Sequence, residues 1–223
     1  DDQVEVQLST PQPRKVLLVS REPSPIERVL KTLPKLTVST VPPESYQSSG
    51  GADLVILDGF VPQTLPDADL LIMNPPLDSP GLVAHPSGVE AAVLRSRTGN
   101  PLVDSVDLQS LRLGQMVRLE TPVWARVIVE GQQGPLILQG ERSGRRIVIF
   151  NFDWMLFDLP RMQAFPLLLS NAIDQLNPTM LPGKLQPGNT VQMAPLRAPA
   201  AGYSVCRMGL FFSERLTIHA FCL

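Results

Sequence analysis

The first half of the chain alternates apolar segments of strand length with polar stretches rich in proline and serine. A continuous apolar run is typical of a strand that is buried on both faces of a parallel sheet. Strands are therefore predicted at residues 16–19, 36–41, 52–60 and 68–76. Between the first two, Ser24 is a plausible N-cap and Pro25 the first residue of a short amphipathic helix. Strand, helix, strand and short crossovers predict a mainly parallel α/β sheet.

The second half is richer in predicted strands. Three lie at residues 89–95, 115–120 and 124–131, and two more share residues 135–152 with a turn at 142–144. These last two are expected to form an antiparallel hairpin at the edge of the sheet. A long helix with an apolar face follows, for which Asp158 is a natural N-cap. Pro166 lies inside this helix and is expected to kink it or to shift its start.

These elements divide the chain into three parts. Residues 1–12 are expected to be a terminal strand or a linker, because their alternating pattern predicts a half-exposed strand with no partner nearby. Residues 13–178 carry the α/β pattern and are predicted to form one domain. Residues 179–223 show no clean period and are expected to be an irregular tail, either the start of another domain or a non-native continuation.

Composition narrows the classes of partner and cofactor. The 223 residues carry 19 basic and 21 acidic side chains and a net charge of −2, without a basic stripe, which argues against nucleic acid as a partner. No apolar run approaches the ~18 residues that cross a bilayer, although a segment cut from a membrane protein would look the same. Cys206 and Cys222 both lie in the tail, and no cysteine or histidine spacing suits a metal. We therefore expect no metal and no cofactor.

Asp58 ends the apolar run LVIL and is the residue that most suggests chemistry. An aspartate at this place accepts a phosphoryl group in receiver domains, but that reaction needs a divalent metal held by acidic side chains just after the first strand. Ser20 and Arg21 stand there instead. No nucleophile elbow of the G-x-S-x-G type is present, and His85 is expected to be a surface loop residue. No catalytic residue is therefore predicted.

A candidate binding site is predicted from four polar residues that follow the ends of predicted strands: Arg21, Asp58, Asn74 and Asp153. The carboxyl ends of parallel strands share one edge of an α/β sheet, where such folds bind ligands. Structural roles are the alternative for these residues. Asp58 can accept hydrogen bonds from the backbone of its own turn, and the nearby Trp154 is more often a core residue than a ligand platform.

Several stretches together resemble a known family: RKVLLVS at 14–20, ADLVILDGF at 52–60, the strands within 124–153 and DLPRMQAFPLLLSN at 158–171. They resemble the class I glutamine amidotransferase-like domain of bacterial membrane-anchored von Willebrand factor A proteins, of the aerotolerance-operon type. The resemblance implies a flavodoxin-like sheet on the extracytoplasmic side of a bacterial membrane, preceded by a β-sandwich whose last strand is residues 1–12. The Cys-His-Glu triad of working amidotransferases has no counterpart here, which argues against catalysis.

We therefore predict a non-catalytic interaction or scaffold domain of a larger membrane-anchored bacterial surface protein. Its expected partners are proteins, chiefly other domains of the same membrane protein, with membrane association through segments absent from this chain. The alternative is a small-ligand-binding or hydrolase-type enzyme that uses the polar residues at the carboxyl edge of the sheet.

Overall fold

The computed structural model describes residues 13–21, 24–90, 92–97, 99–108, 115–154, 164–176, 206–212 and 216–222. The chain forms two compact units, one of Gln12–Asn177 and one of Asp1–Pro11 together with Pro178–Leu223. The second unit contains an antiparallel pair, β11 (Cys206–Phe212) and β12 (Leu216–Cys222), within the segment expected to be irregular. The strand predicted over residues 1–12 lies outside the described residues.

The larger unit follows the predicted order of strands and helices, except that two strands, at residues 84–90 and 93–96, replace the one predicted at 89–95. Its elements are β1 (Arg14–Val19), α1 (Pro25–Thr32), β2 (Leu36–Val41), η1 (Pro43–Ser45), β3 (Leu54–Asp58), β4 (Asp69–Met73), β5 (Ala84–Glu90), β6 (Val93–Ser96), η2 (Pro101–Val103), β7 (Gln115–Leu119), β8 (Ala125–Gly131), β9 (Gly134–Arg142), β10 (Arg145–Phe150) and α2 (Ala164–Leu176). α1 begins at Pro25 after Ser24, as predicted, but the Ser24 side chain makes no cap hydrogen bond. Pro166 lies in the first turn of α2, where its missing N–H would have no partner within the helix.

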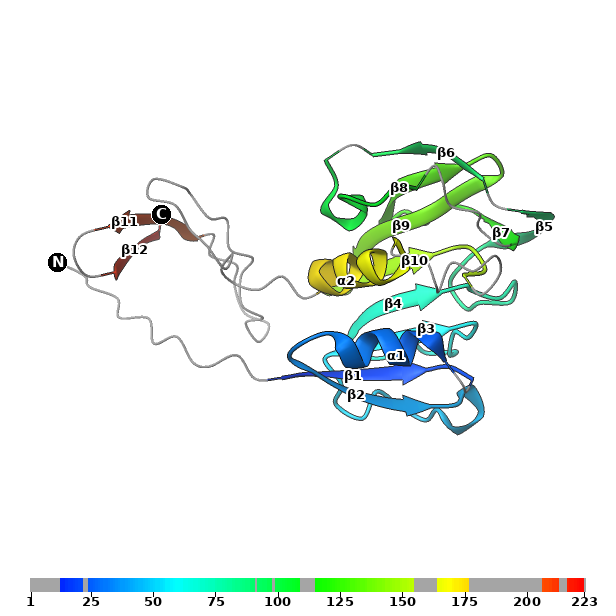
Figure 1. Ribbon diagram of the computed structural model, residues 1–223, viewed down its shortest axis with the longest axis horizontal. Coiled ribbons are helices and arrows are strands. Elements are labelled where there is room, and N and C mark those ends of the chain that lie inside the picture. Colours follow the sequence, from blue (N-terminus) through cyan, green and yellow to red (C-terminus); the bar gives the residue numbers. More distant parts are fainter. Residues whose placement is uncertain are drawn as a thin grey trace. The chain divides into compact units, whose positions relative to one another are not determined.

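Eight strands form one sheet in the order β2-β1-β3-β4-β10-β9-β8-β6 (Figure 1). From β2 to β10 all neighbours are parallel, and from β10 to β6 all are antiparallel. With β10 counted as the fifth strand, the parallel part has the order 2-1-3-4-5 of flavodoxin-like folds. The predicted fold class is confirmed with one refinement. The predicted edge hairpin is β9–β10, and β8 and β6 lie outside it.

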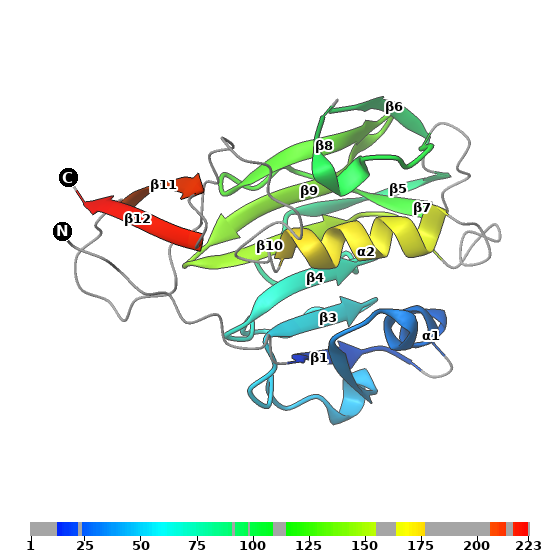
Figure 2. The same ribbon diagram turned by 60° about the vertical axis from the view of Figure 1, so that its left-hand side comes forward.

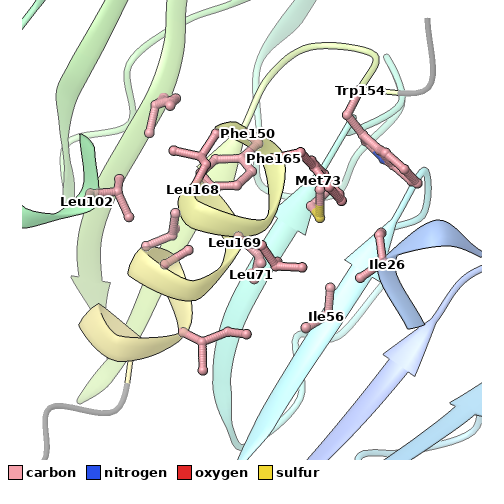
Figure 3. Packing of buried hydrophobic residues seen from close by; sticks show 14 of the residues in the cluster. Ile26, Ile56, Leu71, Met73, Leu102, Phe150, Trp154, Phe165, Leu168 and Leu169 are labelled. Carbon is pink, nitrogen blue, oxygen red and sulfur yellow. The ribbon is translucent and has the colours of Figure 1, made fainter. Parts of the chain in front are cut away.

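The two faces of the sheet are covered differently. α1 and α2 lie on the same face (Figure 2), and their apolar side chains form one core cluster with the strands. In Figure 3, Ile26 of α1 lies beside Ile56, and Leu169 of α2 lies beside Leu71. The opposite face holds a second cluster, to which no residue of α1 or α2 contributes. Among the described residues, connecting segments and β7 cover this face, which we call the helix-free face.

Arg14 joins the start of β1 to the end of α2. Its side chain is 7% exposed, and its guanidinium donates to the carbonyl oxygens of Ile173 and Leu176 at 3.4 and 3.2 Å. The same group donates to Asp69 Oδ2 at 3.3 Å. Burial lowers the pKa of Arg14, and the charge of Asp69 opposes this effect. A buried cation thus satisfies carbonyl groups in the last turns of α2.

Candidate functional site

Asp58 is the last residue of β3 and lies at the carboxyl edge of the sheet, as predicted. Two side chains hold its carboxylate: Ser20 Oγ donates to Oδ2 at 2.7 Å, and Trp154 Nε1 donates to Oδ1 at 2.8 Å. Ser20 directly follows β1 and Trp154 follows β10, so the carboxylate ties together segments at the ends of three strands. These side chains, rather than the backbone of its own turn, are the partners of Asp58. We call the three residues the Asp58 network.

Trp154 belongs to the core. It is 2% exposed, and its ring stacks on Phe165 of α2 with 5.2 Å between the ring centroids and 13° between the planes. Figure 3 shows the indole in the same group of side chains as Met73 and Phe165. In flavodoxin-like folds the ligand crevice lies where the strand order reverses, between β1 and β3. The Asp58 network occupies that point with the protein's own side chains.

Burial raises the pKa of Asp58 above its ordinary value of 3.8. The hydrogen bonds from Ser20 and Trp154 act in the opposite direction, because they stabilise the carboxylate, and the charge of Asp153 raises the pKa further. A raised pKa is common in general acids. A general acid also needs an oxygen that faces its substrate, whereas both oxygens of Asp58 face donors of the protein itself.

The other three predicted site residues differ in how close they lie to Asp58. The side chain of Arg21 is 82% exposed and lies 3.7 Å from Glu44, so it is a surface residue. Asn74 has a left-handed backbone, with φ of 49°, and its N–H donates to a carbonyl oxygen at the end of β10. Asp153 is close enough to Asp58 for the two charges to interact. The structure therefore brings Asp58 and Asp153 together and gives Arg21 and Asn74 other contacts.

Ser20 and Trp154 are the members of the network that sequence reasoning missed. A signal for Ser20 existed, because Ser20 directly follows the apolar run 16–19 just as Asp58 follows the run 54–57. The register of β1 and β3 places the two residues side by side. No comparable signal existed for Trp154, because its position depends on the path of the chain after β10. Long-range packing therefore completes the network.

No metal centre is evident among the residues that the structure describes. In that part of the chain no group of three or more His, Cys, Asp and Glu side chains is placed to hold a metal ion. His85 lies in β5 rather than in a loop, and its Nε2 is 3.2 Å from Glu120 Oε1 at the surface. Asp158, the predicted N-cap, lies outside the described residues.

Three hollows lie on the helix-free face. The largest is a groove of about 790 Å³ lined by residues 46–49, 59–67 and three residues of the segment 76–80. A second hollow of about 410 Å³ shares residues 46–49 with it. A third of about 300 Å³ shares residues 63–65 and Pro80 with the groove. None of these three hollows is lined by the four predicted site residues.

The groove combines aromatic, uncharged polar and apolar side chains with two carboxylates, Asp67 and Asp78. The rings of Tyr46 and Phe60 meet edge to face with 5.7 Å between their centroids. Gln47, Ser48 and Gln63 are among the polar residues that line it. The sequence predicted these segments only as surface loops, because their composition indicates turns but not which face of the sheet they cover.

The sequence matches no protein-family model, and no curated protein matches it. Solved structures with a similar fold share little sequence with it. A cytoplasmic protein of Salmonella typhimurium LT2 has a TM-score of 0.53 at 10% identity, over 73% of this chain and 99% of its own. A second cytoplasmic protein of Salmonella typhimurium has a TM-score of 0.52 at 10% identity, over 73% and 98%. A ThuA-like protein of Parabacteroides merdae has a TM-score of 0.51 at 11% identity, over 80% and 94%.

These likenesses agree with the sheet order in supporting an amidotransferase-like fold. At such low identity they carry information about the fold and none about activity. They also carry no information about an association with von Willebrand factor A domains. The function must therefore be argued from the residues of this chain.

The predicted location on the extracytoplasmic side of a bacterial membrane is wrong by this comparison. The two Salmonella proteins are both described as cytoplasmic. In the described part of the chain, no helix is long and apolar enough to cross a membrane. The prediction rested on the family resemblance alone, and a fold type does not fix where a protein works.

Proposed function

We propose that the α/β unit is a non-catalytic interaction or scaffold domain of a larger protein, of the von Willebrand factor A-associated type that its sequence resembles. One observation carries this proposal. Both carboxylate oxygens of Asp58 are held by side chains of the protein itself, Ser20 and Trp154. The acid best placed for chemistry therefore holds strand ends together.

Releasing Asp58 for chemistry would be costly. If Oδ1 turned away from the N–H of Trp154 towards a substrate, that N–H, whose residue is 2% exposed, would lack an acceptor. A buried donor without a partner costs roughly 1–3 kcal/mol. Moving the indole with the carboxylate would instead break its stacking on Phe165. The closed arrangement is favoured, and a structural role for Asp58 follows from it.

The helix-free face supports an interaction role. Parallel sheets ordinarily carry helices on both faces, whereas connecting segments cover this one and leave a groove of about 790 Å³. Protein interfaces are enriched in aromatic residues and depleted of charged ones at their centre. The groove has the aromatic pair Tyr46 and Phe60, flanked by amide and hydroxyl side chains, and its lining includes only two charged residues, Asp67 and Asp78. Proteins are therefore the partners that suit this surface.

A second candidate function is a small-ligand site at the carboxyl edge. One observation favours it, because Asp58 has a raised pKa and interacts with the charge of Asp153. Pairs of neighbouring carboxyl groups are also used for acid–base catalysis. This candidate requires the Asp58 network to open when a ligand binds.

A thermal-shift screen of the full chain against metal ions, nucleotides, sugars and amino acids separates the two candidates. Asp58→Asn and Asp153→Asn are screened alongside. A ligand at 100 times its Kd stabilises a fold by about 2.7 kcal/mol, which is a readable shift in Tm. We expect no compound to raise the Tm and both variants to fold. A compound that stabilises the natural chain and neither variant would overturn the proposal.

A further inference from the structure

The eight-stranded sheet has two edge strands, β2 and β6, and they differ in how well they are protected against pairing with a strand of another molecule. An unpaired edge presents N–H and C=O groups to other strands, and proteins blunt it with short strands, bulges, prolines or charges. β6 has four residues, and its register with β8 is irregular. It also carries Arg95, which forms an ion pair with Glu130. The β6 edge is therefore poorly suited to pairing.

β2 lacks these protective features. Its six residues, LTVSTV, include neither a charged residue nor a proline. They pair with β1 in one continuous parallel register. The side chains of Thr37 and Ser39 are exposed, and those of Leu36 and Val38 are half-buried against the core on the helix face. β2 is thus a regular, uncharged edge strand of ordinary length.

Among the residues that the structure describes, β2 pairs with β1 alone, so no strand lies on the outer side of its backbone. The N–H of Arg14, the first residue of β1, donates to the carbonyl oxygen of Lys35, and the N–H of Ser20, which follows β1, donates to that of Val41. In a parallel pair, alternate residues direct both of their polar groups to the same neighbour. The odd-numbered residues of β2 therefore face β1. The N–H and C=O groups that point away from the sheet belong to Leu36, Val38 and Thr40.

We propose that β2 pairs with β2 of a second copy of this chain, antiparallel, around a two-fold axis at Val38. In this register Val38 lies opposite Val38 of the second copy, Leu36 opposite Thr40, and Thr37 opposite Ser39. The outward N–H and C=O groups of the two strands then bond each other, and the two sheets become continuous. This inference goes beyond the proposed function, because the dimer could form with or without a ligand site.

Two features favour a second copy over an unrelated strand. First, no side chain of β2 is charged, so pairing with itself sets no like charges opposite each other. Second, the flanks of the strand have opposite charges: the exposed Lys35 precedes β2, and the exposed Glu44 follows it in η1. An isologous antiparallel contact brings the Lys35 end of each copy to the Glu44 end of the other. The flanking charges therefore favour the antiparallel orientation, and Glu44 also lies beside Arg21 of its own chain.

Sedimentation equilibrium of the full chain tests the proposal with two matched double variants. Thr37→Lys with Ser39→Lys places lysine opposite lysine twice across the proposed interface. Thr37→Lys with Ser39→Glu places lysine opposite glutamate at the same positions. Both variants lose the same long hydrogen bond, from Ser39 Oγ to the Val16 oxygen at 3.4 Å, so their effects on the monomer are matched in this respect.

We expect the natural chain to dimerise, and the lysine–lysine variant to have a dimer Kd about tenfold or more above that of the lysine–glutamate variant. Val38→Pro gives an independent test. It removes an outward N–H and no bond to β1, a place where edge strands tolerate proline, and it should abolish the dimer while circular dichroism stays native.

A natural chain that remains monomeric at its highest soluble concentration would overturn the proposal. So would a dimer that both double variants weaken equally, because its contact would then lie elsewhere or in another register. Sedimentation tests only the dimer, and the thermal-shift screen tests only the non-catalytic role. Failure of one proposal therefore leaves the other standing.

Discussion

Substitutions of Asp58 should separate hydrogen-bond chemistry from size and charge. In Asp58→Asn, the amide oxygen can still accept from Trp154 Nε1, and the new N–H can donate to Ser20 Oγ, because a hydroxyl accepts as well as donates. All three groups stay paired. Asp58→Ala removes both acceptors and leaves the indole N–H of Trp154 buried without a partner.

The expected magnitudes follow from these contacts. An unpaired buried donor costs about 1–3 kcal/mol. The Ser20 hydroxyl can still donate to a second, weaker acceptor, the Arg21 carbonyl oxygen at 3.4 Å. The full cost of an unpaired donor is therefore assigned only to the indole N–H. With the lost packing of the side chain, Asp58→Ala should lower the free energy of unfolding by about 2–4 kcal/mol. Asp58→Asn should stay within about 1 kcal/mol of the natural chain, since its hydrogen bonds are kept.

The pH dependence has a definite sign. Burial raises the pKa of Asp58, so ionisation costs more in the folded chain than in the unfolded one. The stability contributed by protonated Asp58 is complete below its ordinary pKa of 3.8 and is lost as pH rises through the raised folded pKa. Asp58→Asn has no such group. The free energy of unfolding of Asp58→Asn minus that of the natural chain should therefore rise with pH above 3.8 and then level off.

Urea unfolding, followed by tryptophan fluorescence across this pH window, measures both quantities for the natural chain and the two variants. If the asparagine variant were as unstable as the alanine variant, the hydrogen bonds to Ser20 and Trp154 would not be what makes Asp58 stabilising. A difference that falls with rising pH would refute the assigned direction of the pKa shift.

Four further substitutions test other contacts of the α/β unit by the same urea assay. Arg14→Met should cost about 3 kcal/mol, because the carbonyl groups of Ile173 and Leu176 lose a buried charged donor; a neutral effect would show that these bonds contribute nothing. Gly140→Ala should cost about 2 kcal/mol or more, because its Cβ would lie 2.1 Å from the Trp124 oxygen. Gly144→Ala is its control, with φ of +72° and no atom within 4 Å, and should cost only about 1 kcal/mol of backbone strain. Trp154→Phe should cost about 1–2 kcal/mol and more at high pH, because it leaves Oδ1 of an ionised Asp58 without its donor; a loss that shrinks as pH rises would contradict this.

The central parallel strands β1, β3 and β4 could be predicted from the sequence because most of their residues are buried on both faces. The run Leu54 to Leu57 is fully buried and ends at Asp58, so its apolar pattern marks both the strand and its carboxyl end. The absence of helices from the helix-free face could not be predicted in the same way. The connection between β3 and β4 contains no helix, and its prolines, Pro62 and Pro66, indicate only that the chain turns. Which face such a segment covers is decided by packing against the finished sheet.

The candidate site was predictable at Asp58 and much less so around it. Ser20 and Arg21 are adjacent in sequence, yet Ser20 is 1% exposed and Arg21 is largely exposed. Successive residues of an extended chain point to opposite sides, so proximity in sequence was a poor guide to which of the two meets Asp58. Trp154 reaches the carboxylate from a segment 96 positions away, and local pattern carries no information about such a contact.

The indole N–H of Trp154 reports most directly on whether Asp58 is held by the protein. The chain has two tryptophans, and Trp124, which packs on the helix-free face, is the internal control. In ¹⁵N spectra of the full chain, assigned with Trp124→Phe, the Trp154 indole proton should exchange slowly with solvent. Its resonance should move with pH as Asp58 titrates above 3.8, and that of Trp124 should not. The opposite result is a Trp154 indole proton that exchanges as fast as that of Trp124 and a resonance that does not move with pH. It would mean that the Asp58 carboxylate is not held by Trp154, and the proposal of a non-catalytic domain would lose its main support.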